Sequence, residues 1–286
     1  MIGDMSTRDS LQRLFRYSLD SDNPLRSGGC GHIWKAHDLL CNRPVAIKTV
    51  AEELQWRYGD KASRTFQKEA MAAARLGEFS PHILKVLDLG SIDETIYSVM
   101  DWIEPDRGFV GIDLTERAGR VSLAQAKGIM RQVCEAVGVA HANGIVHSDI
   151  APANIVFDPQ DNLFKLADFG LLRIAESWLV SRGLGSLLCG GRLDFFPQEV
   201  KDSTINISYA SDIYALTVTF RVLLEGGACL PSLGGNIVPT PGVIRIRHEQ
   251  RDAPDAVRQL LRRFIDAHTT KDSIDEFVSM LQKVPN

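Results

Sequence analysis

The stretch GIVHSDIAPANIVFDPQDNLFKLADFG, residues 144–170, constrains the fold of this chain more than any other. Its two apolar runs flank the turn-forming residues DPQDN, 158–162, and so predict a β-hairpin. Asp149 and Asn154 precede the hairpin, and Asp168 follows it. Each of these residues alone is typical of a turn or cap. Together, two carboxylates and an amide brought to one cleft by a hairpin are suitable oxygen ligands for two magnesium ions.

Length and composition limit the classes of protein to consider. The 286 residues are enough for one large domain or for two lobes that share a cleft. With 44% apolar and 24% charged residues, the chain is of ordinary globular composition. The net charge of −4 does not indicate a nucleic-acid-binding surface, so we expect no nucleic-acid partner.

The cysteines and the apolar segments indicate a compartment. An odd number of cysteines, five, without a C-x-x-C pair favours a reducing environment over a disulfide framework or a zinc site. The first 15 residues lack the apolar core of a signal peptide. The longest apolar run, IYALTVTFRVLLEGG, is interrupted by Arg221 and is too short to cross a bilayer. We therefore expect a cytoplasmic protein without membrane insertion.

The two halves of the chain differ in their patterns. Residues 32–38 and 43–50 alternate as a strand hairpin, residues 63–79 are rich in helix formers, and residues 82–103 contain two strands around a Gly-Ser-Ile-Asp turn. Four helices are expected later, at residues 122–144, 211–227, 253–268 and 273–284. This order predicts an α+β protein with an N-terminal extension (1–23), a small sheet-rich N-lobe (24–103) and a larger helical C-lobe (104–286).

Two further motifs precede the hairpin. Gly28, Gly29 and Gly31 form a glycine-rich turn before a strand, which permits either an ordinary hairpin turn or close approach to phosphates. Lys48 ends the apolar run VAIK, where it is either solvated or drawn toward an anion. Glu69, 21 residues later on the predicted helix, is a candidate partner for Lys48 or an exposed helix residue.

From about residue 24 to residue 284, the chain resembles the eukaryotic-like Ser/Thr protein kinases. The resemblance rests on six motifs that occur in this order: the glycine turn, VAIK, the helix glutamate, D…N, DFG and SDIYAL. The resemblance implies the bilobal protein-kinase fold, with a β-rich N-lobe carrying one main helix and a mainly α-helical C-lobe. It also implies ATP-dependent transfer of the γ-phosphoryl group to Ser or Thr hydroxyls of protein substrates, with ATP and Mg²⁺ as cofactors.

The resemblance also implies a role for individual residues. Nucleotide-binding positions are Gly28, Gly29 and Gly31 over the phosphates, Ile33 and Ala46 against the adenine, Met100 behind it, Asp101 to Ile103 as the hinge and Val156 beneath it. Lys48 would hold the phosphates with Glu69 as its ion-pair partner. Asp149 would accept the substrate proton, Asn154 and Asp168 would bind metal, and Asp212 would support the catalytic loop. His147 and Phe169 match stacked structural positions.

Several positions depart from the family pattern. Arg26 replaces the first loop glycine, and Ser148 replaces an arginine that normally meets a phosphorylated loop, so control by loop phosphorylation (candidate sites Ser177, Ser181 and Ser186) is not expected. Ala151 and Gly191 replace the usual lysine and threonine of the catalytic site. Glu199 and Lys271 replace the usual Glu and Arg pair, while Arg182 or Arg192 could supply the missing cation.

Two alternatives to an active protein kinase follow from these departures. The missing cation is compatible with a nucleotide-binding pseudokinase that acts as a scaffold or switch. The HSD sequence also resembles the catalytic loop of aminoglycoside phosphotransferases, which modify small molecules. The physiological substrate and the oligomeric state are not indicated by the sequence. For residues 1–23, a frayed extension is favoured over a docking segment.

Overall fold

The chain forms two compact units. The computed structural model describes residues 11, 15–28, 31–92, 95–105, 112–169, 192–197, 200, 207–226, 243–266 and 272–285. The first unit comprises Met1–Glu78 and Leu84–Trp102, and the second comprises Phe79–Ile83 and Ile103–Asn286. The expected seam between residues 103 and 104 therefore lies one residue earlier. In addition, a short segment from the first half of the chain belongs to the second unit.

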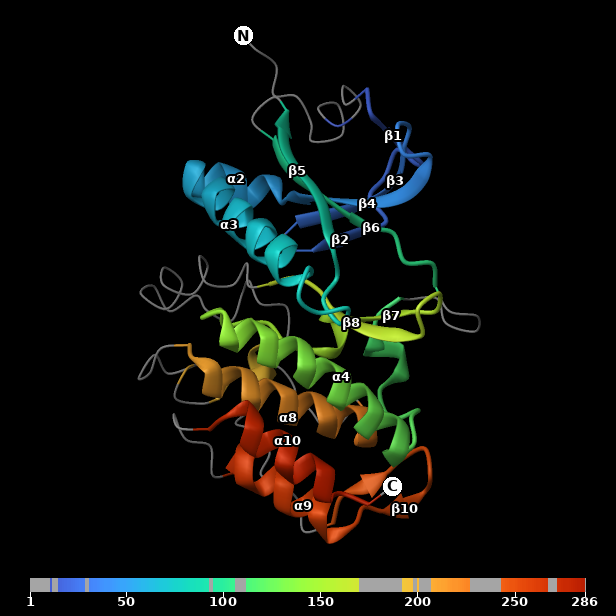
Figure 1. Ribbon diagram of the computed structural model, residues 1–286, viewed down its shortest axis with the longest axis vertical. Helices are drawn as coiled ribbons and strands as arrows, with labels where there is room; N and C mark the ends of the chain where they lie inside the picture. Colours follow the sequence, from blue (N-terminus) through green and yellow to red (C-terminus); the bar gives the residue numbers. More distant parts are fainter. Residues whose placement is uncertain are drawn as a thin grey trace. The chain divides into compact units, whose positions relative to one another are not determined.

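An antiparallel sheet forms the body of the first unit (Figure 1). Its strands are β1 (Tyr17–Leu19), β2 (Arg26–Gly28), β3 (Gly31–Asp38), β4 (Arg43–Val50), β5 (Val86–Ile92) and β6 (Thr95–Asp101). The order is β1-β3-β4-β6-β5, and β2 also pairs with β3. The strands expected within residues 32–50 and 82–103 are thus present.

Strand alternation gives this sheet two different faces. Trp34, Ala36, Val45, Ile47 and Val99 lie in one buried cluster. The residues between them point to the opposite face, because successive side chains of a strand alternate. In the pairing of β3 with β4, Ile33 lies opposite Lys48 and Lys35 lies opposite Ala46. In the pairing of β4 with β6, Ala46 lies opposite Met100. The second face therefore carries the side chains expected to meet a nucleotide.

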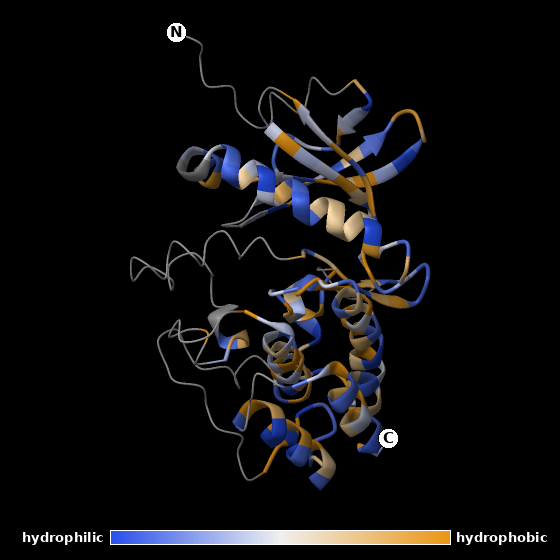
Figure 2. Ribbon diagram, turned by 60° about the vertical axis from the view of Figure 1, so that its left-hand side comes forward, coloured by the Kyte–Doolittle hydropathy of each residue, from blue (hydrophilic) through white to orange (hydrophobic). Residues whose placement is uncertain are grey.

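The first unit also contains the helices α2 (Glu52–Tyr58) and α3 (Asp60–Leu76). Hydrophilic and hydrophobic residues alternate along α3 (Figure 2), as expected for a helix with one face on a sheet. Its buried stripe is Ala62, Phe66, Ala70, Ala73 and Leu76, and the helix packs against β4, β5 and β6. The sequence predicted α3 three residues late and missed α2, which has no side-chain cap to mark its start.

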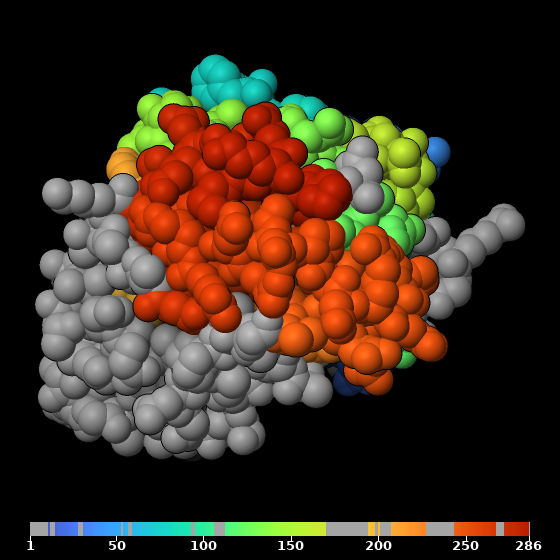
Figure 3. Space-filling model, turned by 90° about the horizontal axis from the view of Figure 1, so that it is seen from below, coloured from blue at the N-terminus to red at the C-terminus, as the bar shows by residue number. Residues whose placement is uncertain are grey.

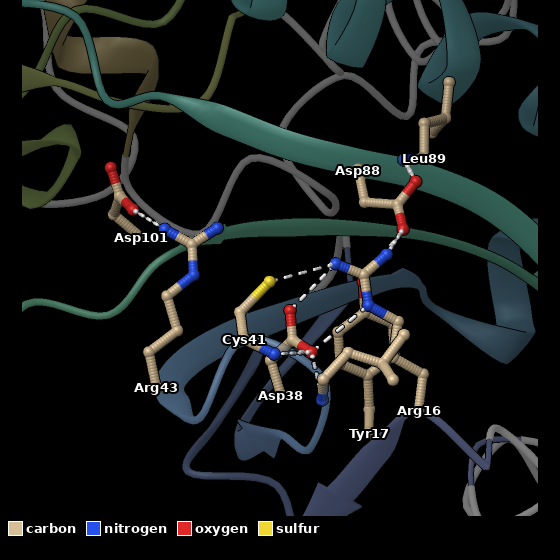
Figure 4. A network of polar contacts seen from close by, with 9 residues as sticks. Arg16, Tyr17, Asp38, Cys41, Arg43, Asp88, Leu89 and Asp101 are labelled. Carbon is tan, nitrogen blue, oxygen red and sulfur yellow. Dashed lines mark hydrogen bonds and ion pairs between the residues drawn. The ribbon is translucent and has the colours of Figure 1, made fainter.

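The N-terminal residues correct the expected boundary at residue 23. Strand β1, within the predicted frayed extension, pairs with β3 over Tyr17–Leu19, and Leu11 is fully buried in the outer cluster of the sheet. Arg16 donates to both carboxylate oxygens of Asp38, at 3.2 and 2.8 Å, and to Asp88 at 3.0 Å (Figure 4). The described part of this segment is therefore built into the sheet. A three-residue strand is too short to be recognised by alternation.

Helices dominate the second unit, with α4 (Leu123–Ala142), α8 (Tyr209–Glu225), α9 (Asp255–Leu261) and α10 (Ile274–Lys283). Ser122 and Gln125 cap the start of α4 reciprocally. The side chains from Ala210 to Leu224 are all buried, so α8 is the central helix of this unit. Helix α9 continues into a π-helical turn at Arg262–Asp266 and lies beside α10 on one face of the unit (Figure 3).

Short elements complete the second unit. The expected hairpin is formed by β7 (Ile155–Asp158) and β8 (Leu163–Leu166), and a second small hairpin by β9 (Arg245–Ile246) and β10 (Arg251–Asp252). In the described part of the chain, the 3₁₀ turns are η1 (Leu114–Arg117), η2 (Pro152–Asn154) and η4 (Arg192–Phe195). Among the described residues, no helix is long and apolar enough to cross a membrane.

Candidate active site

Lys48 lies on the second face of the first unit's sheet. It is only 8% exposed and belongs to the continuously buried run at the end of β4. The solvated strand-end position considered from the sequence therefore does not apply. A buried ammonium needs a compensating charge or anion, and Ile33, Ala46 and Met100 provide apolar surface on the same face of the sheet.

Glu69 lies on the packed stripe of α3. Its side chain is half-buried. Because Glu69 lies three residues after Phe66 and four residues before Ala73, it is on the same side of the helix as these buried residues. Since α3 packs against β4, Glu69 and Lys48 belong to neighbouring elements. Their ion pair remains a prediction.

The glycine turn closes β2 onto β3. Gly28 pairs with Gly31, while Gly29 lies outside the described residues. A β-carbon at Gly31 would lie 2.1 Å from the carbonyl oxygen of Thr49, so no other residue fits without moving β4. Close packing between strands is thus sufficient to require this glycine, and its role over phosphates remains a prediction.

The expected hinge follows β6. Met100 is buried, the N–H of Asp101 donates to the Lys85 carbonyl at 3.3 Å, and the Asp101 carboxylate lies 3.7 Å from an Arg43 guanidinium nitrogen. Ile103, the third hinge residue, begins the second unit and is buried. Val156, expected beneath the adenine, is buried on β7.

A single buried carboxylate organises the loop before the hairpin. Asp212, at the start of α8, accepts hydrogen bonds from the backbone N–H groups of His147 and Ser148, each at 2.8 Å. It also lies 2.8 Å from Nε2 of His141, at the end of α4. Helices α4 and α8 therefore fix this loop together through Asp212, as the sequence predicted for that residue.

His147 joins the loop to the end of the hairpin. Its Nδ1 accepts from the Asp149 N–H at 3.2 Å, so the ring proton is on Nε2, which donates to the Ala167 carbonyl at 3.0 Å. Its ring also packs on Phe169, with centroids 4.6 Å apart. These contacts agree with the structural roles expected for His147 and Phe169.

Asp149 and Asn154 are held together in the second unit. The Asn154 amide nitrogen donates to the carbonyl and to the carboxylate of Asp149, both at 2.7 Å. Because both bonds use the nitrogen, the amide oxygen points away from Asp149. The Asn154 carbonyl accepts from the N–H of Ala167, the residue before Asp168, at 2.8 Å. The hairpin thus brings the two predicted metal-binding residues close together.

Two of these positions have unusual backbone conformations. Ser148 has φ +62° and Asp168 has φ +58°, a region that non-glycine residues rarely adopt. Such strain is concentrated at functional sites. The Ser148 hydroxyl is buried and has no hydrogen-bond partner among the described residues, so this side chain provides no substitute for the arginine it replaces.

The other departures are resolved only in part. Ala151 is 3% exposed and contributes no cation. The described residues exclude Gly191, Ser177, Ser181, Ser186, Arg182, Glu199 and Lys271, and do not include the side chain of Arg192. The predictions made for these residues therefore stay predictions.

Lys165 on β8 forms a charged cluster that the sequence did not indicate. Its ammonium contacts Asp158 at 2.6 Å and Asp161 at 2.7 Å. Burial alone would raise the pKa of Asp158, but the hydrogen bonds from Lys165 and the Gln160 N–H outweigh it and lower that pKa. Alternation places Lys165 on the same face as Leu163, which could have suggested that it is buried. The cluster stabilises the turn that positions Asp168.

The fold and the loop geometry define a protein kinase domain. The family model described as "Protein kinase domain" matches residues 20–280, and the chain belongs to this family. Serine/threonine-protein kinase PrkC of Bacillus subtilis (strain 168) is 31% identical over 232 residues, which cover 81% of this chain and 33% of PrkC. Serine/threonine-protein kinase PknE of Mycobacterium tuberculosis (strain ATCC 25618 / H37Rv) is 33% identical over 230 residues, 76% of this chain and 38% of PknE.

The chain thus spans about a third of the length of these relatives. Among solved structures, a PknI kinase domain of Mycobacterium tuberculosis, the C20A_R136A double mutant, superposes with a TM-score of 0.68. The match covers 94% of this chain and 95% of that one. At 24% identity, this similarity shows the fold and nothing about function. The predicted family and fold class are confirmed.

Proposed function

We propose that this chain is an ATP-dependent protein kinase that transfers the γ-phosphoryl group to Ser or Thr hydroxyls of protein substrates. The observation that carries the proposal is the loop held by Asp212, in which Asn154 fixes the carboxylate of Asp149 beside the end of the hairpin that bears Asp168. The names of the similar kinases PrkC and PknE support Ser/Thr specificity.

The sheet of the first unit would bind the nucleotide. Ile33, Ala46 and Met100 share one face with Lys48, which fits an apolar base next to charged phosphates. We assign Lys48 to the phosphates, Glu69 to Lys48, and the backbone of Asp101 and Ile103 to the adenine edge. We assign Gly28, Gly29 and Gly31 to the phosphates and Val156 to the base.

The donor chemistry of Asn154 and Asp168 fits Mg²⁺. An amide oxygen directed away from Asp149 and a carboxylate are the hard oxygen ligands that Mg²⁺ prefers. Among the described residues there is no group of three or more His, Cys, Asp or Glu arranged for a metal. Mg²⁺ bound beside a nucleotide is typically held by one or two carboxylates together with phosphates and water. When bound, the metal would supply positive charge beside the phosphates.

Asp149 would orient the substrate hydroxyl and accept its proton. Phosphoryl transfer requires positioning and charge stabilisation more than covalent chemistry from the protein. The hydrogen bonds from Asn154 to the Asp149 carboxylate and to its backbone carbonyl hold this residue in place before substrate binds. Since Ala151 gives no cation, we infer that Lys48 and Mg²⁺ carry more of the stabilising charge here than in kinases with a lysine at this position.

The test is transfer of label from [γ-³²P]ATP to a mixed protein substrate with Mg²⁺. We expect Asp149→Asn to reduce phosphoserine and phosphothreonine at least about 100-fold while ADP binding is retained, because positioned proton acceptors contribute about 10²–10⁴-fold. Asp255→Asn, at a surface carboxylate that is 75% exposed, is the matched control and should keep the wild-type rate. Equal labelling by wild type and Asp149→Asn would reject the proposal in favour of a scaffold, and labelling of small molecules alone would indicate the phosphotransferase alternative.

A further inference from the structure

Two cations of the sheet reach the hinge in the first unit. Arg43, at the start of β4, lies 3.7 Å from the Asp101 carboxylate (Figure 4), and Lys35 of β3 lies over the ring of Trp102, 4.7 Å from its centroid. Lys35 lies opposite Ala46, so it belongs to the face of the sheet that would bind the nucleotide. The side chains of two consecutive hinge residues are thus held by neighbouring strands.

Trp102 depends on such contacts because the strand ladder ends before it. The last backbone pair between β6 and β4 joins Asp101 to Val45. In the described part of the chain, the indole nitrogen of Trp102 is buried and has no hydrogen-bond partner. A buried indole normally finds an acceptor. The ring is therefore positioned through its face, where the Lys35 ammonium lies.

Lys35 is itself fixed from the strand next to it. Its ammonium lies 3.9 Å from the carboxylate of Asp20, and its carbonyl accepts the Asp20 N–H at 3.0 Å. The ammonium is thereby directed between an acid at the end of β1 and the ring of Trp102. The position of the Lys35 ammonium over the aromatic face is the geometry of a cation–π contact.

We propose that Lys35 and Trp102 are positioning residues for nucleotide binding that hold the hinge backbone in the conformation that bonds adenine. This inference rests on the proposed function. If the contact only sets the fraction of molecules whose hinge can bind the nucleotide, its loss lowers this fraction. The apparent nucleotide affinity then falls in proportion, while turnover at saturating ATP is unchanged. A contact of this kind at a partly exposed site corresponds to a change of about two- to fivefold.

The experiment measures the dissociation constant of ADP by calorimetry, and KM for ATP and kcat by initial rates. We expect Trp102→Leu and Lys35→Met each to raise the ADP dissociation constant and KM about threefold, with kcat within about twofold of wild type. Trp102→Phe and Lys35→Arg keep the ring face and the charge, so they should stay near wild type. The double variant Trp102→Leu with Lys35→Met should be no weaker than either single variant.

Matched controls are Trp56→Leu and Lys61→Met, which change exposed residues of α2 and α3. The inference is overturned if Trp102→Leu or Lys35→Met binds ADP as tightly as wild type does, or if the effects of the two substitutions add in the double variant. It is also overturned if only kcat and the melting temperature fall, because that result would indicate a purely structural role. If wild type itself binds no ADP, the proposed function fails first, so the two failures are distinguishable.

Discussion

At the scale of single residues, Asp212 determines the geometry of the catalytic loop. Its two oxygens receive two backbone N–H groups and contact Nε2 of His141, and the side chains of Asp212, His147 and Ser148 are all buried. Charged acceptors of backbone N–H groups form the stronger class of hydrogen bond. The position of Asp149, two residues after His147, therefore depends on a carboxylate that is expected to touch neither ATP nor protein substrate.

We predict that Asp212→Asn lowers both activity and stability. The amide has one acceptor oxygen, so one of the N–H groups of His147 and Ser148 would face an NH₂ group. Leaving a buried donor unsatisfied costs about 1–3 kcal/mol, and we expect kcat to fall about tenfold or more as the loop loses its position. Urea unfolding and initial rates at saturating ATP measure the two effects. Wild-type kcat in this variant would show that the loop is held by other contacts.

The candidate site residues could be proposed from the sequence because the motif spacings single them out, whereas the contacts that support them could not. Asn154 contacts Asp149, and the paired strands of the hairpin bring Ala167, the residue before Asp168, to Asn154; the roles of these three residues remain a prediction. Nothing in the sequence paired Asn154 specifically with Asp149, or Lys165 with Asp158. Such contacts depend on side-chain directions that become defined only when the elements are packed.

At the scale of elements, the N-terminal segment is fastened to the sheet by charge as well as by apolar packing. Asp38, at the end of β3, is 1% exposed and accepts from Arg16 and from the N–H groups of Leu40 and Cys41. Arg16 also reaches Asp88 on β5 (Figure 4). One arginine thus ties β1 to two other strands, which explains why a segment with little strand propensity is ordered there.

This network makes a pH-dependent contribution to stability. The hydrogen bonds from Arg16 hold the pKa of Asp38 well below its ordinary value, despite burial, which opposes ionisation. A lowered carboxyl pKa stabilises the fold fully above the unfolded pKa of about 3.9, and the contribution declines as pH falls below that value. We predict that Asp38→Asn lowers the urea midpoint at pH 7 and that the difference from wild type shrinks at pH 3. A difference that is constant with pH would contradict this assignment.

At the scale of the whole molecule, the sequence predicted the order of elements but not that residues 79–83 belong to the second unit. Strands and helices were readable from their periodicities, and the family resemblance supplied the fold. Residues 79–83, however, belong to the second unit although the chain on both sides belongs to the first. That assignment depends on long-range contacts of Ile83 and His82 with Leu166, for which the local pattern has no signal.

His82 is the most connected residue of this inserted segment. Its carbonyl accepts the Leu166 N–H at 2.8 Å, its Nδ1 lies 3.1 Å from the Phe164 carbonyl, and its Nε2 lies 3.3 Å from a Glu135 oxygen. The segment joins the end of α3 to β5, and its contacts with β8 and α4 hold it within the second unit.

We predict that His82→Ala lowers the stability of the second unit by about 1–3 kcal/mol, the cost of buried groups losing their partners. Far-UV circular dichroism during urea unfolding is weighted toward the helices of this unit and measures the effect. The midpoint should fall in His82→Ala, whereas the exposed His248→Ala should keep the wild-type midpoint. A wild-type midpoint in His82→Ala would show that the contacts of this side chain do not stabilise the second unit.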